Sequence, residues 1–378
     1  MVLLWQLMTD RNISMKSIGI VMGYRMGGIF SVYKILAPEL AKTFDIKTLT
    51  MDNHLRQGTI EGIQEIDLCV KSPLKGIRIL IFLLQFVRKS KLNNLKYFII
   101  NNQGVGILVY IASLCFNFRY IIHQHSPIEE SISNKSNVFL KKLYIFFLIN
   151  TFRKADYIIC NSRYIEENII NSLKLTNTRV IYNPIDISKI IEGAERTDGI
   201  KYDKANFNFL SVGRLSRAKG YDVLIKAVNK VRMHINNAFK VFIIGDGEEH
   251  DALNNLIEKY DLHNYVVLCG FKKEPYADIK NCDCYLSTSL WEGFGITIAY
   301  AMILKKPIIA SRTGGAIEIL NKENAFCNIS DDDDLSNKMI SMILNKKTNE
   351  AIVTANYEKA LGFDYKHVAG QFRLLLEE

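Results

Sequence analysis

The stretch Phe207-Asn-Phe-Leu-Ser-Val-Gly-Arg-Leu-Ser-Arg-Ala-Lys-Gly220 begins with an apolar run and ends with glycine and basic residues. The run Phe207–Val212 is typical of a strand buried in a parallel sheet. A helical pattern follows over residues 220–233. A buried strand, a glycine-containing turn and a helix make up half of a strand–helix–strand unit. This stretch therefore predicts an α/β fold with cations at the carboxyl edge of a parallel sheet.

The same alternation extends in both directions along the chain. Strands are predicted at 17–22, 46–51, 97–101, 120–124, 157–161, 179–182, 207–212, 240–245, 265–269, 282–286 and 307–310. Helices are predicted at 28–42, 73–91, 104–115, 138–153, 162–173, 220–233, 249–260, 276–281, 295–304, 315–320 and 331–344. The pattern breaks around Asn183–Asn206, so we expect two doubly wound, Rossmann-like domains that face a cleft.

The domain boundaries follow from this break. Residues 1–185 are expected to form an N-terminal domain, with residues 1–14 as an extension, and residues 186–364 a C-terminal domain. A last helix over about 365–378 is expected to pack back on the first domain. Because the first strand begins directly after Met15, that methionine offers a natural start for translation as well as Met1.

Composition excludes several classes of protein. Of the 378 residues, 48% are hydrophobic and 23% charged, which is an ordinary globular mixture rather than a disordered one. No apolar run reaches the ~20 residues that span a bilayer. Polar Thr9–Asn12, with Asp10, interrupt the place where a signal peptide has its apolar run. A cytoplasmic protein is therefore expected, peripheral to the inner face of the cell membrane if its basic surface binds lipid.

The positive charge is concentrated in one half of the chain. Residues 1–190 hold 24 Lys/Arg and 13 Asp/Glu, and no acidic residue occurs between Asp67 and Glu129. Such a surface attracts nucleic acid, an anionic membrane or a phosphorylated substrate. No zinc-finger spacing, RNP motif or heptad array indicates a nucleic-acid module. A solvated helix and a membrane-facing patch over Leu74–Phe86 remain as alternatives.

Cysteine and histidine spacing gives no metal or disulfide signal. The seven cysteines contain no C-x-x-C pair, and the seven histidines no H-E-x-x-H motif. Reduced thiols and no protein-built metal site are expected. There is also no Walker loop and no G-x-S-x-G elbow, and Gly245-Asp-Gly247 lacks the third glycine of a dinucleotide fingerprint.

A phosphate-binding arrangement remains. Gly213-Arg214 ends one predicted strand, and Lys219-Gly220 opens the next helix, so an arginine fork and a lysine charge converge on a helix N-terminus. In the other domain, Gly27-Gly28 precedes a helix and lets backbone N–H groups approach a phosphate. Each glycine alone is well explained as a turn residue. Together they predict a diphosphate held between two domains.

A carboxylate is predicted at the same edge. Trp291-Glu-Gly-Phe-Gly295 follows the strand that ends near Ser287 and opens another helix. Glu292 is suited there to accept hydrogen bonds from sugar hydroxyls. A helix-capping glutamate is the alternative, but the neighbouring glycines favour close approach of a ligand to the backbone.

These residues resemble the large family of retaining, metal-independent nucleotide-sugar glycosyltransferases with the GT-B fold. The resemblance extends over nearly the whole chain from Met15. It rests on Gly27-Gly28, 180–186 (Val-Ile-Tyr-Asn-Pro-Ile-Asp), 211–220 (Ser-Val-Gly-Arg-Leu-Ser-Arg-Ala-Lys-Gly), 243–247 (Ile-Ile-Gly-Asp-Gly), 287–295 (Ser-Thr-Ser-Leu-Trp-Glu-Gly-Phe-Gly) and 311–318 (Ser-Arg-Thr-Gly-Gly-Ala-Ile-Glu). It implies that residues 1–185 form the acceptor-side domain and residues 186–364 the donor-binding domain. It also implies that Arg214 and Lys219 bind the donor diphosphate and that Glu292 contacts the donor sugar.

The resemblance also implies a catalytic imidazole and a set of donor contacts. Of the two histidines in Ile122-His-Gln-His-Ser126, His125 is favoured because it is nearer the carboxyl edge of the strand. The catalytic set is then His125, Glu292, Arg214 and Lys219. The donor-binding set is Gly27, Gly28, Gly213, Arg214, Lys219, Gly245, Gly293, Phe294, Gly295 and Tyr300.

Tyr300 departs from the family pattern. The family places a second glutamate eight positions after the first, where it binds the nucleotide ribose, and this chain has tyrosine there. Loss of a charge-assisted hydrogen bond of about 1.5–3 kcal/mol weakens donor binding about ten- to a hundredfold. We interpret Tyr300 as an altered nucleotide contact.

The expected reaction is transfer of a hexosyl group to a hydroxyl acceptor, with a lipid-linked saccharide of bacterial surface-polysaccharide assembly as acceptor. A noncatalytic partner subunit that binds nucleotide sugar is one alternative, and a sugar-nucleotide epimerase of the same fold is another. No cofactor and no metal are expected beyond the donor itself.

Overall fold

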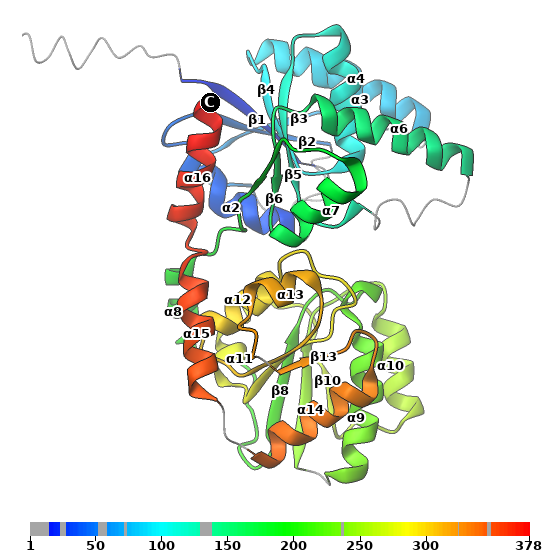
Figure 1. The fold of residues 1–378 in the computed structure, drawn as a ribbon, viewed down its shortest axis with the longest axis vertical. Helices are drawn as coiled ribbons and strands as arrows, with labels where there is room; N and C mark the ends of the chain where they lie inside the picture. The colour runs from blue at the N-terminus through cyan, green and yellow to red at the C-terminus, as the bar shows by residue number, and fades with distance from the viewer. Residues whose placement is uncertain are drawn as a thin grey trace, which may run out of the picture.

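The computed structural model describes residues 15–22, 28–51, 59–71, 74–128, 138–235, 238–323, 325–345 and 349–378. These residues form two parallel sheets with their helices, stacked along the long axis of the molecule (Figure 1). We call them the N-terminal domain (β1–β7 with their helices and α16) and the C-terminal domain (β8–β13 with their helices). The predicted fold class of two doubly wound parallel-sheet domains is confirmed.

The N-terminal sheet has the strand order β3-β2-β1-β4-β5-β6-β7, and every pair is parallel. Its strands are β1 (Ser17–Met22), β2 (Asp45–Thr50), β3 (Gln64–Asp67), β4 (Tyr97–Ile100), β5 (Arg119–Gln124), β6 (Ile158–Cys160) and β7 (Thr178–Val180). Its helices are α2 (Gly28–Leu40), α3 (Lys75–Leu92), α4 (Gln103–Cys115), α6 (Val138–Lys154) and α7 (Arg163–Leu173). The order reverses between β1 and β4, which opens a ligand-binding crevice at the carboxyl ends of such sheets.

Both faces of this sheet are buried, as the apolar strands predict. Along β1, Ile18 and Ile20 pack into one core cluster with α2, and Val21 packs into the other with α3 and α4. Successive side chains of a strand point to opposite faces, so one apolar strand supports two cores. At Gly19 an added Cβ would lie 2.7 Å from the Phe98 ring, so only glycine lets that ring lie against the strand.

The C-terminal sheet is also fully parallel, in the order β10-β9-β8-β11-β12-β13. Its strands are β8 (Phe207–Val212), β9 (Phe239–Ile244), β10 (Val266–Leu268), β11 (Cys284–Ser287), β12 (Ile308–Ser311) and β13 (Ala325–Cys327). Its helices are α8 (Ile187–Ala194), α9 (Tyr221–His234), α10 (His250–Lys259), α11 (Tyr276–Asn281), α12 (Ile296–Ile303), α13 (Gly314–Ile319), α14 (Asp332–Asn345) and α15 (Glu350–Leu361). The order reverses between β8 and β11, as in the first sheet.

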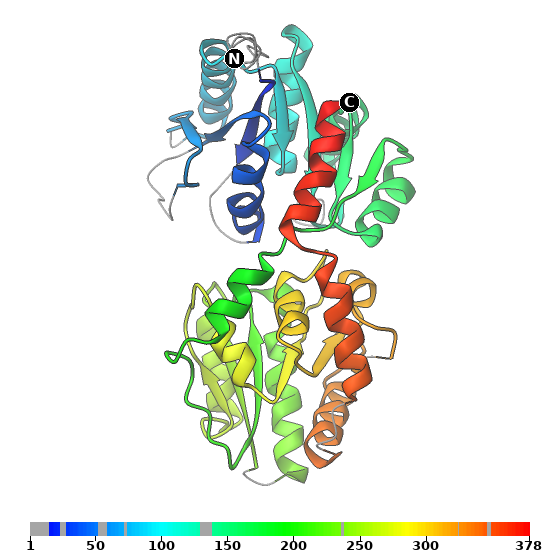
Figure 2. The ribbon, with the colours of Figure 1, turned by 90° about the vertical axis from the view of Figure 1, so that its left-hand side faces the viewer.

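The chain crosses between the domains twice, at neighbouring points. Ile185 donates its N–H to the Phe363 carbonyl (2.8 Å) and accepts the N–H of Tyr365 (3.0 Å). The last helix, α16 (Tyr365–Glu377), then packs against α2 of the N-terminal domain, with Phe372 fully buried in that core. Figure 2 shows α16 in red beside the N-terminal sheet and α15 beside the C-terminal one.

The sequence prediction missed two edge strands and two helices, α8 and α15. β3 and β13 extend the two sheets at their outer edges, and β3 reads Gln-Glu-Ile-Asp with one buried side chain. Edge strands need little apolar sequence because much of their surface stays in water. α8 lies inside the segment predicted as a break, and the Asp186 side chain caps it by accepting the Lys189 N–H (3.0 Å).

Candidate functional site

Lys219 and Glu292 form an ion pair at the carboxyl edge of the C-terminal sheet. The Lys219 Nζ lies 2.5 Å from Glu292 Oε2, with exposed fractions of 26% and 18%. The Ser289 hydroxyl lies 3.5 Å from the same carboxylate oxygen. The sequence predicted these two residues for one site on the basis of separate motifs, and the structure brings them together.

The loops that carry this pair are fastened to each other. Leu290 donates its N–H to the Ala218 carbonyl (2.8 Å), and the Thr288 hydroxyl donates to the Lys219 carbonyl (2.9 Å). Gly220 has φ +60°, and an added Cβ would lie 2.3 Å from the Thr288 carbonyl oxygen. Only glycine fits both the left-handed conformation and this close approach. The backbone therefore fixes where Lys219 leaves its loop relative to Glu292.

Arg214 begins at the same edge but points elsewhere. Its preceding residue, Gly213, lies against the Lys219 side chain, because an added Cβ would be 3.3 Å from Lys219 Cε. The guanidinium instead pairs with Glu248, with Nη2 3.0 Å from Oε2, and the Arg214 side chain is 70% exposed. An exposed pair of this kind contributes only about 0–1 kcal/mol. A diphosphate can therefore replace Glu248 as the partner of Arg214 at little cost.

The predicted glycines at this edge divide into two kinds. At Gly245 an added Cβ would lie 1.8 Å from the Gly213 carbonyl oxygen, so this glycine is required by contact between two loops of the same domain. At Gly293 an added Cβ would lie 2.2 Å from the carbonyl oxygen of His125, which belongs to the other domain. Gly293 therefore brings the Glu292 loop directly against the end of β5.

Phe294 corrects one prediction. Its side chain is 1% exposed and packs against Tyr182 and Phe363, with ring centroids 5.9 and 5.0 Å apart. A ring buried in this core cannot contact a donor, so only the Phe294 backbone is left for that role. The neighbouring Gly295 precedes α12 and has φ +92°. Glycine adopts this positive φ without strain.

Tyr300 packs against α11 in the core of the C-terminal domain. Its ring packs edge-on against Tyr276 of α11, with centroids 5.3 Å apart at 82°, inside the core cluster that includes α8 and α12. Burial raises the pKa of the Tyr300 hydroxyl, and the neighbouring Tyr276 adds to this shift. In this structure the hydroxyl is therefore neutral and faces a second tyrosine.

Of the two predicted N-terminal glycines, Gly27 lies outside the described residues. Gly28 is the first residue of α2, and an added Cβ would be 3.4 Å from Ile296 Cδ1 of α12. The N-terminus of α2 therefore contacts the C-terminal domain next to the Glu292 loop. A helix N-terminus carries a partial positive charge that favours anions.

His125 lies opposite the Glu292 loop and has a histidine neighbour that the sequence analysis set aside. The His123 and His125 rings are 4.0 Å apart, and the buried Nε2 atoms of both have no hydrogen-bond partner among the described residues. The Tyr33 hydroxyl lies 2.8 Å from His123 Nδ1, and Asn161 donates to the His125 carbonyl (3.3 Å). Tyr33 and Asn161 are site residues that no sequence motif indicated.

Burial keeps both rings uncharged. Burial lowers the pKa of His125 to about 4, while a side-chain hydrogen bond with Asn183 acts in the opposite direction. Burial, with the neighbouring His125 as a second cause, holds the pKa of His123 well below its usual range. A neutral imidazole donates through one nitrogen and accepts through the other. His125 can therefore hydrogen-bond a neutral sugar hydroxyl without attracting the diphosphate.

These shifts predict loss of stability in mild acid. Between pH 6.5 and about 4 the unfolded chain binds protons on these histidines and the folded chain does not, so the free energy of unfolding falls as the pH falls through this window. Replacing His123 with phenylalanine should make this dependence shallower. Chemical denaturation at pH 7, 6 and 5 measures it. If the free energy of unfolding depends on pH equally in the variant and the unchanged protein, His123 does not cause this loss of stability.

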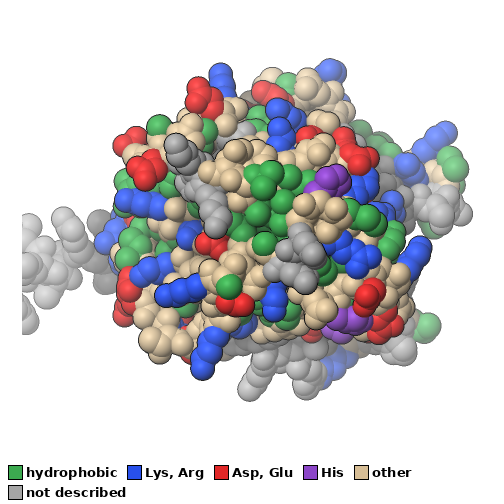
Figure 3. All heavy atoms as spheres, turned by 90° about the horizontal axis from the view of Figure 1, so that it is seen from below, with side chains coloured by type: hydrophobic (Ala, Val, Ile, Leu, Met, Phe, Trp, Pro, Cys, Tyr) green, Lys and Arg blue, Asp and Glu red, His purple; other side chains and the backbone are tan. Residues whose placement is uncertain are grey.

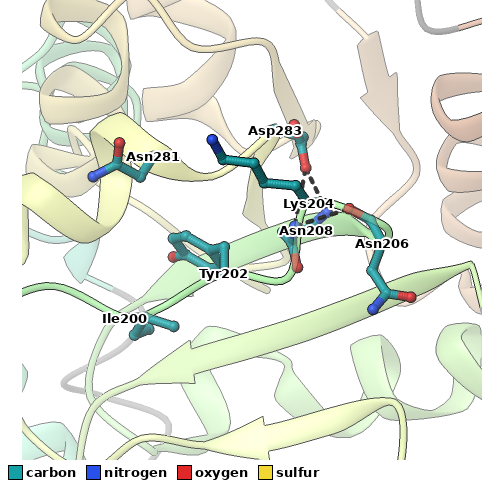
Figure 4. Close-up of a pocket in the computed structure, with 7 residues that line it drawn as sticks. All are labelled: Ile200, Tyr202, Lys204, Asn206, Asn208, Asn281 and Asp283. Carbon is teal, nitrogen blue, oxygen red and sulfur yellow. Dashed lines mark hydrogen bonds between the residues drawn. The ribbon is translucent and has the colours of Figure 1, made fainter.

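A cavity lies at the other end of the C-terminal sheet. It measures about 440 Å³ and is lined by residues that include Tyr202, Lys204, Asn208 and Asp283 (Figure 4). Asp283 accepts the backbone N–H of Asn208 (2.7 Å) at the amino ends of β8 and β11. This cavity is therefore at the opposite edge of the sheet from Lys219 and Glu292.

Solved structures place the fold in one class. Anabaena HepE in complex with UDP matches at a TM-score of 0.76 and 21% identity, over 96% of this chain and 100% of that chain. Sucrose-phosphate synthase from Thermosynechococcus elongatus matches at a TM-score of 0.80 and 17% identity, over 96% of this chain and 98% of that one. At these identities the likeness concerns the fold, which is the GT-B fold.

The sequence narrows this class to a family. The family model described as Glycosyltransferase Family 4 matches residues 26–189, and the model described as Glycosyl transferases group 1 matches residues 195–359. The chain belongs to the GT-B glycosyltransferases with this pair of domains, as its motifs indicated.

Two proteins similar in sequence are also named as glycosyltransferases. An uncharacterised glycosyltransferase of Methanocaldococcus jannaschii is 33% identical over 60% of this chain and 56% of that protein. The N-acetylgalactosamine-N,N'-diacetylbacillosaminyl-diphospho-undecaprenol 4-alpha-N-acetylgalactosaminyltransferase of Campylobacter jejuni is 25% identical over 69% of this chain and 71% of that protein. The first of these alignments spans little more than half the length of the relative.

Proposed function

We propose that this protein transfers a hexosyl group from a nucleoside-diphosphate sugar to a hydroxyl acceptor, with retention at the anomeric carbon. The observation that carries the proposal is the Lys219–Glu292 pair on a loop held against His125 of the opposite domain. The family to which the chain belongs supports the reaction class, and retention follows from the same resemblance.

The ion pair provides a way to couple donor binding to sugar recognition. A diphosphate carries more negative charge than Glu292, so it competes for the Lys219 ammonium. Glu292 is then released to accept hydrogen bonds from the sugar hydroxyls. Arg214 turns from Glu248 to the same phosphates. Charge on the leaving diphosphate is stabilised by these two cations in the transition state, and no divalent metal is assigned a role.

Neutral His125 faces the sugar side of this site. Its position beside Gly293 places a hydrogen-bonding group within the junction of the two domains. Attack of the acceptor hydroxyl on the same face as the departing phosphate gives retention without a protein nucleophile. Contact between the domains excludes water, which protects the donor from hydrolysis.

Nucleotide-sugar binding and turnover test this function together. HepE was solved with UDP and with UDP-glucose, and the Campylobacter jejuni relative is named for an N-acetylgalactosamine transfer, so UDP sugars are the first donors to test. A matching UDP sugar should raise the melting temperature, since a ligand that binds only the folded state stabilises it. EDTA should leave transfer unchanged.

The same assay separates the alternatives. Binding of donors without transfer to any acceptor would favour a noncatalytic partner subunit. Conversion of one nucleotide sugar into another without acceptor would favour an epimerase. Absence of any melting shift with UDP, GDP or their sugars would contradict the proposed function.

We further propose that the acceptor is a lipid-linked saccharide reached at an anionic membrane on the cytoplasmic side, in surface-polysaccharide assembly. α4 packs against both α3 and α6, so these helices form one layer on the N-terminal domain (Figure 1). Large apolar side chains are exposed on the outer two helices, among them Leu84 on α3 and Phe146 on α6. Neither helix contains an acidic residue.

Exposed apolar side chains on helices that carry basic but no acidic residues suit contact with an anionic leaflet better than contact with water alone. Apolar side chains gain about 1.5–3 kcal/mol each when removed from water, and each nearby Lys or Arg adds about 1 kcal/mol at an anionic surface. At the far end of the C-terminal domain, by contrast, Lys/Arg and Asp/Glu are interspersed (Figure 3). No helix among the described residues is long and apolar enough to cross a bilayer.

Vesicle flotation tests the membrane proposal. The L84E/F146E variant should bind vesicles with phosphatidylglycerol at least tenfold more weakly at low salt, because two exposed apolar side chains that would enter the leaflet become charged. L344E on α14 of the C-terminal domain, where Leu344 is 67% exposed, is the matched control and should bind as the unchanged protein does. No flotation of the unchanged protein at low salt would contradict the proposal.

A further inference from the structure

Glu318 connects the two domains through three hydrogen bonds. It lies on α13 of the C-terminal domain, and its Oε1 accepts the Arg163 N–H (2.8 Å) while its Oε2 accepts the Tyr164 N–H (3.0 Å). The Tyr182 hydroxyl also donates to Oε1 (2.9 Å). Arg163 and Tyr164 begin α7 of the N-terminal domain, so a carboxylate of one domain caps a helix of the other.

The helices that carry this contact touch without an intervening side chain. At Gly314, the first residue of α13, an added Cβ would lie 2.1 to 2.4 Å from atoms of the Tyr164 ring. The ring therefore lies directly on the backbone of α13. The carboxylate and the glycine together fix the position of α13 relative to the start of α7.

Both ends of this contact lead to the proposed active site. On the C-terminal side, Gly315 donates its N–H to the Glu292 carbonyl (3.0 Å). On the N-terminal side, Asn161 lies two residues before Arg163 and donates to the His125 carbonyl (3.3 Å). A shift of α13 against α7 therefore moves Glu292 relative to His125.

We propose that Glu318 is a positioning residue that, by capping α7 across the domain junction, holds Glu292 and Lys219 in register with His125. This inference rests on the proposed function. A carboxylate accepts hydrogen bonds with both oxygens and is favoured at a helix N-terminus by the partial positive charge there. Among the described residues, Glu318 is the carboxylate that accepts these two N–H groups, so the motif 311–318 gains a role that donor binding did not require.

Three variants separate positioning from general stability. E318Q keeps the size of the side chain but turns one acceptor into a donor that faces an N–H group of α7. E318A removes the contact altogether, and Y182F removes one hydroxyl from it. E358Q, at an exposed position on α15 of the same domain, is the matched control.

We expect kcat for transfer to fall about tenfold or more in E318Q and E318A and less in Y182F, because misplaced reacting groups lose rate steeply. The Kd for UDP by calorimetry should change less than threefold, since the Glu318 carboxylate binds Arg163, Tyr164 and Tyr182 rather than the Lys219 loop. The radius of gyration from X-ray scattering should increase in E318A as the domains separate. E358Q should match the unchanged protein in all three measurements.

Equal kcat and equal radius of gyration in E318A and E358Q would overturn the proposal. Loss of UDP binding in parallel with kcat would also overturn it, because Glu318 would then act within its own domain. The scattering measurement needs no substrate. If the unchanged protein fails to bind or transfer any nucleotide sugar, the proposed function fails while the scattering comparison still decides whether Glu318 holds the domains together.

Discussion

Replacing Lys219 with methionine should lower kcat/KM for sugar transfer about a hundred- to a thousandfold. The variant keeps the aliphatic part of the side chain but removes the cation that stabilises the leaving diphosphate. It also leaves the Glu292 carboxylate, now 18% exposed beside Lys219, without its ion-pair partner, so that this charge repels the donor phosphates. Initial rates over a range of donor concentrations separate the effect on kcat from that on KM.

Lys226→Met is the matched control for this variant. Lys226 lies on α9 of the same domain and pairs with Asp222 through an exposed contact of 3.1 Å. An exposed pair of this kind is worth little, so activity should stay within about twofold of the unchanged protein. A K219M enzyme that keeps kcat/KM within threefold would remove Lys219 from the catalytic set.

Replacing Gly293 with alanine should lower transfer about a hundredfold. The new Cβ would lie 2.2 Å from the His125 carbonyl oxygen and 3.2 Å from its carbon, so the Glu292 loop must withdraw from β5. Withdrawal by about 1 Å costs roughly a hundredfold in rate when reacting groups are held by two separate elements. Transfer rates together with UDP calorimetry measure this, because the Lys219 loop remains in place to bind the nucleotide.

Gly370→Ala provides the control for an added methyl group. Gly370 lies within α16, and no atom lies within 4 Å of the position of an added Cβ. Alanine in a helix interior is favoured over glycine by roughly 0.5–1 kcal/mol, so this variant should melt slightly higher and transfer normally. Normal transfer by G293A would show that the contact between Gly293 and His125 is not maintained during turnover.

The local sequence pattern was sufficient to predict the central strands of each sheet and the helices that connect them. β1, β4, β8 and β9 are mostly apolar because both of their faces are buried, and burial on both faces leaves a clear sequence signal. The signal is weak at edges, which is why β3 and β13 were missed. It is also weak in short helices fixed by a cap, as α8 is by Asp186.

The candidate site was predicted in part. Lys219, Glu292, Gly293 and His125 were named from motifs, and the structure brings their loops together. The orientation of Arg214 toward Glu248 and the burial of Phe294 were not predicted. Both depend on neighbours far away in sequence, Glu248 after β9 and Phe363 at the domain crossing. A motif specifies which residue is present but not which partner its side chain meets.

The sequence by itself determined that this chain forms two parallel-sheet domains and carries cations, a carboxylate and an imidazole at their carboxyl edges. Periodicity and local turn chemistry encode such features within a few residues of each strand. Only the tertiary structure decided that Gly293 touches His125, that Tyr33 and Asn161 support the imidazole side of the site, and that Glu318 caps a helix of the opposite domain. The physical reason is that these contacts join segments more than 30 residues apart, whose meeting is set by packing of the whole chain.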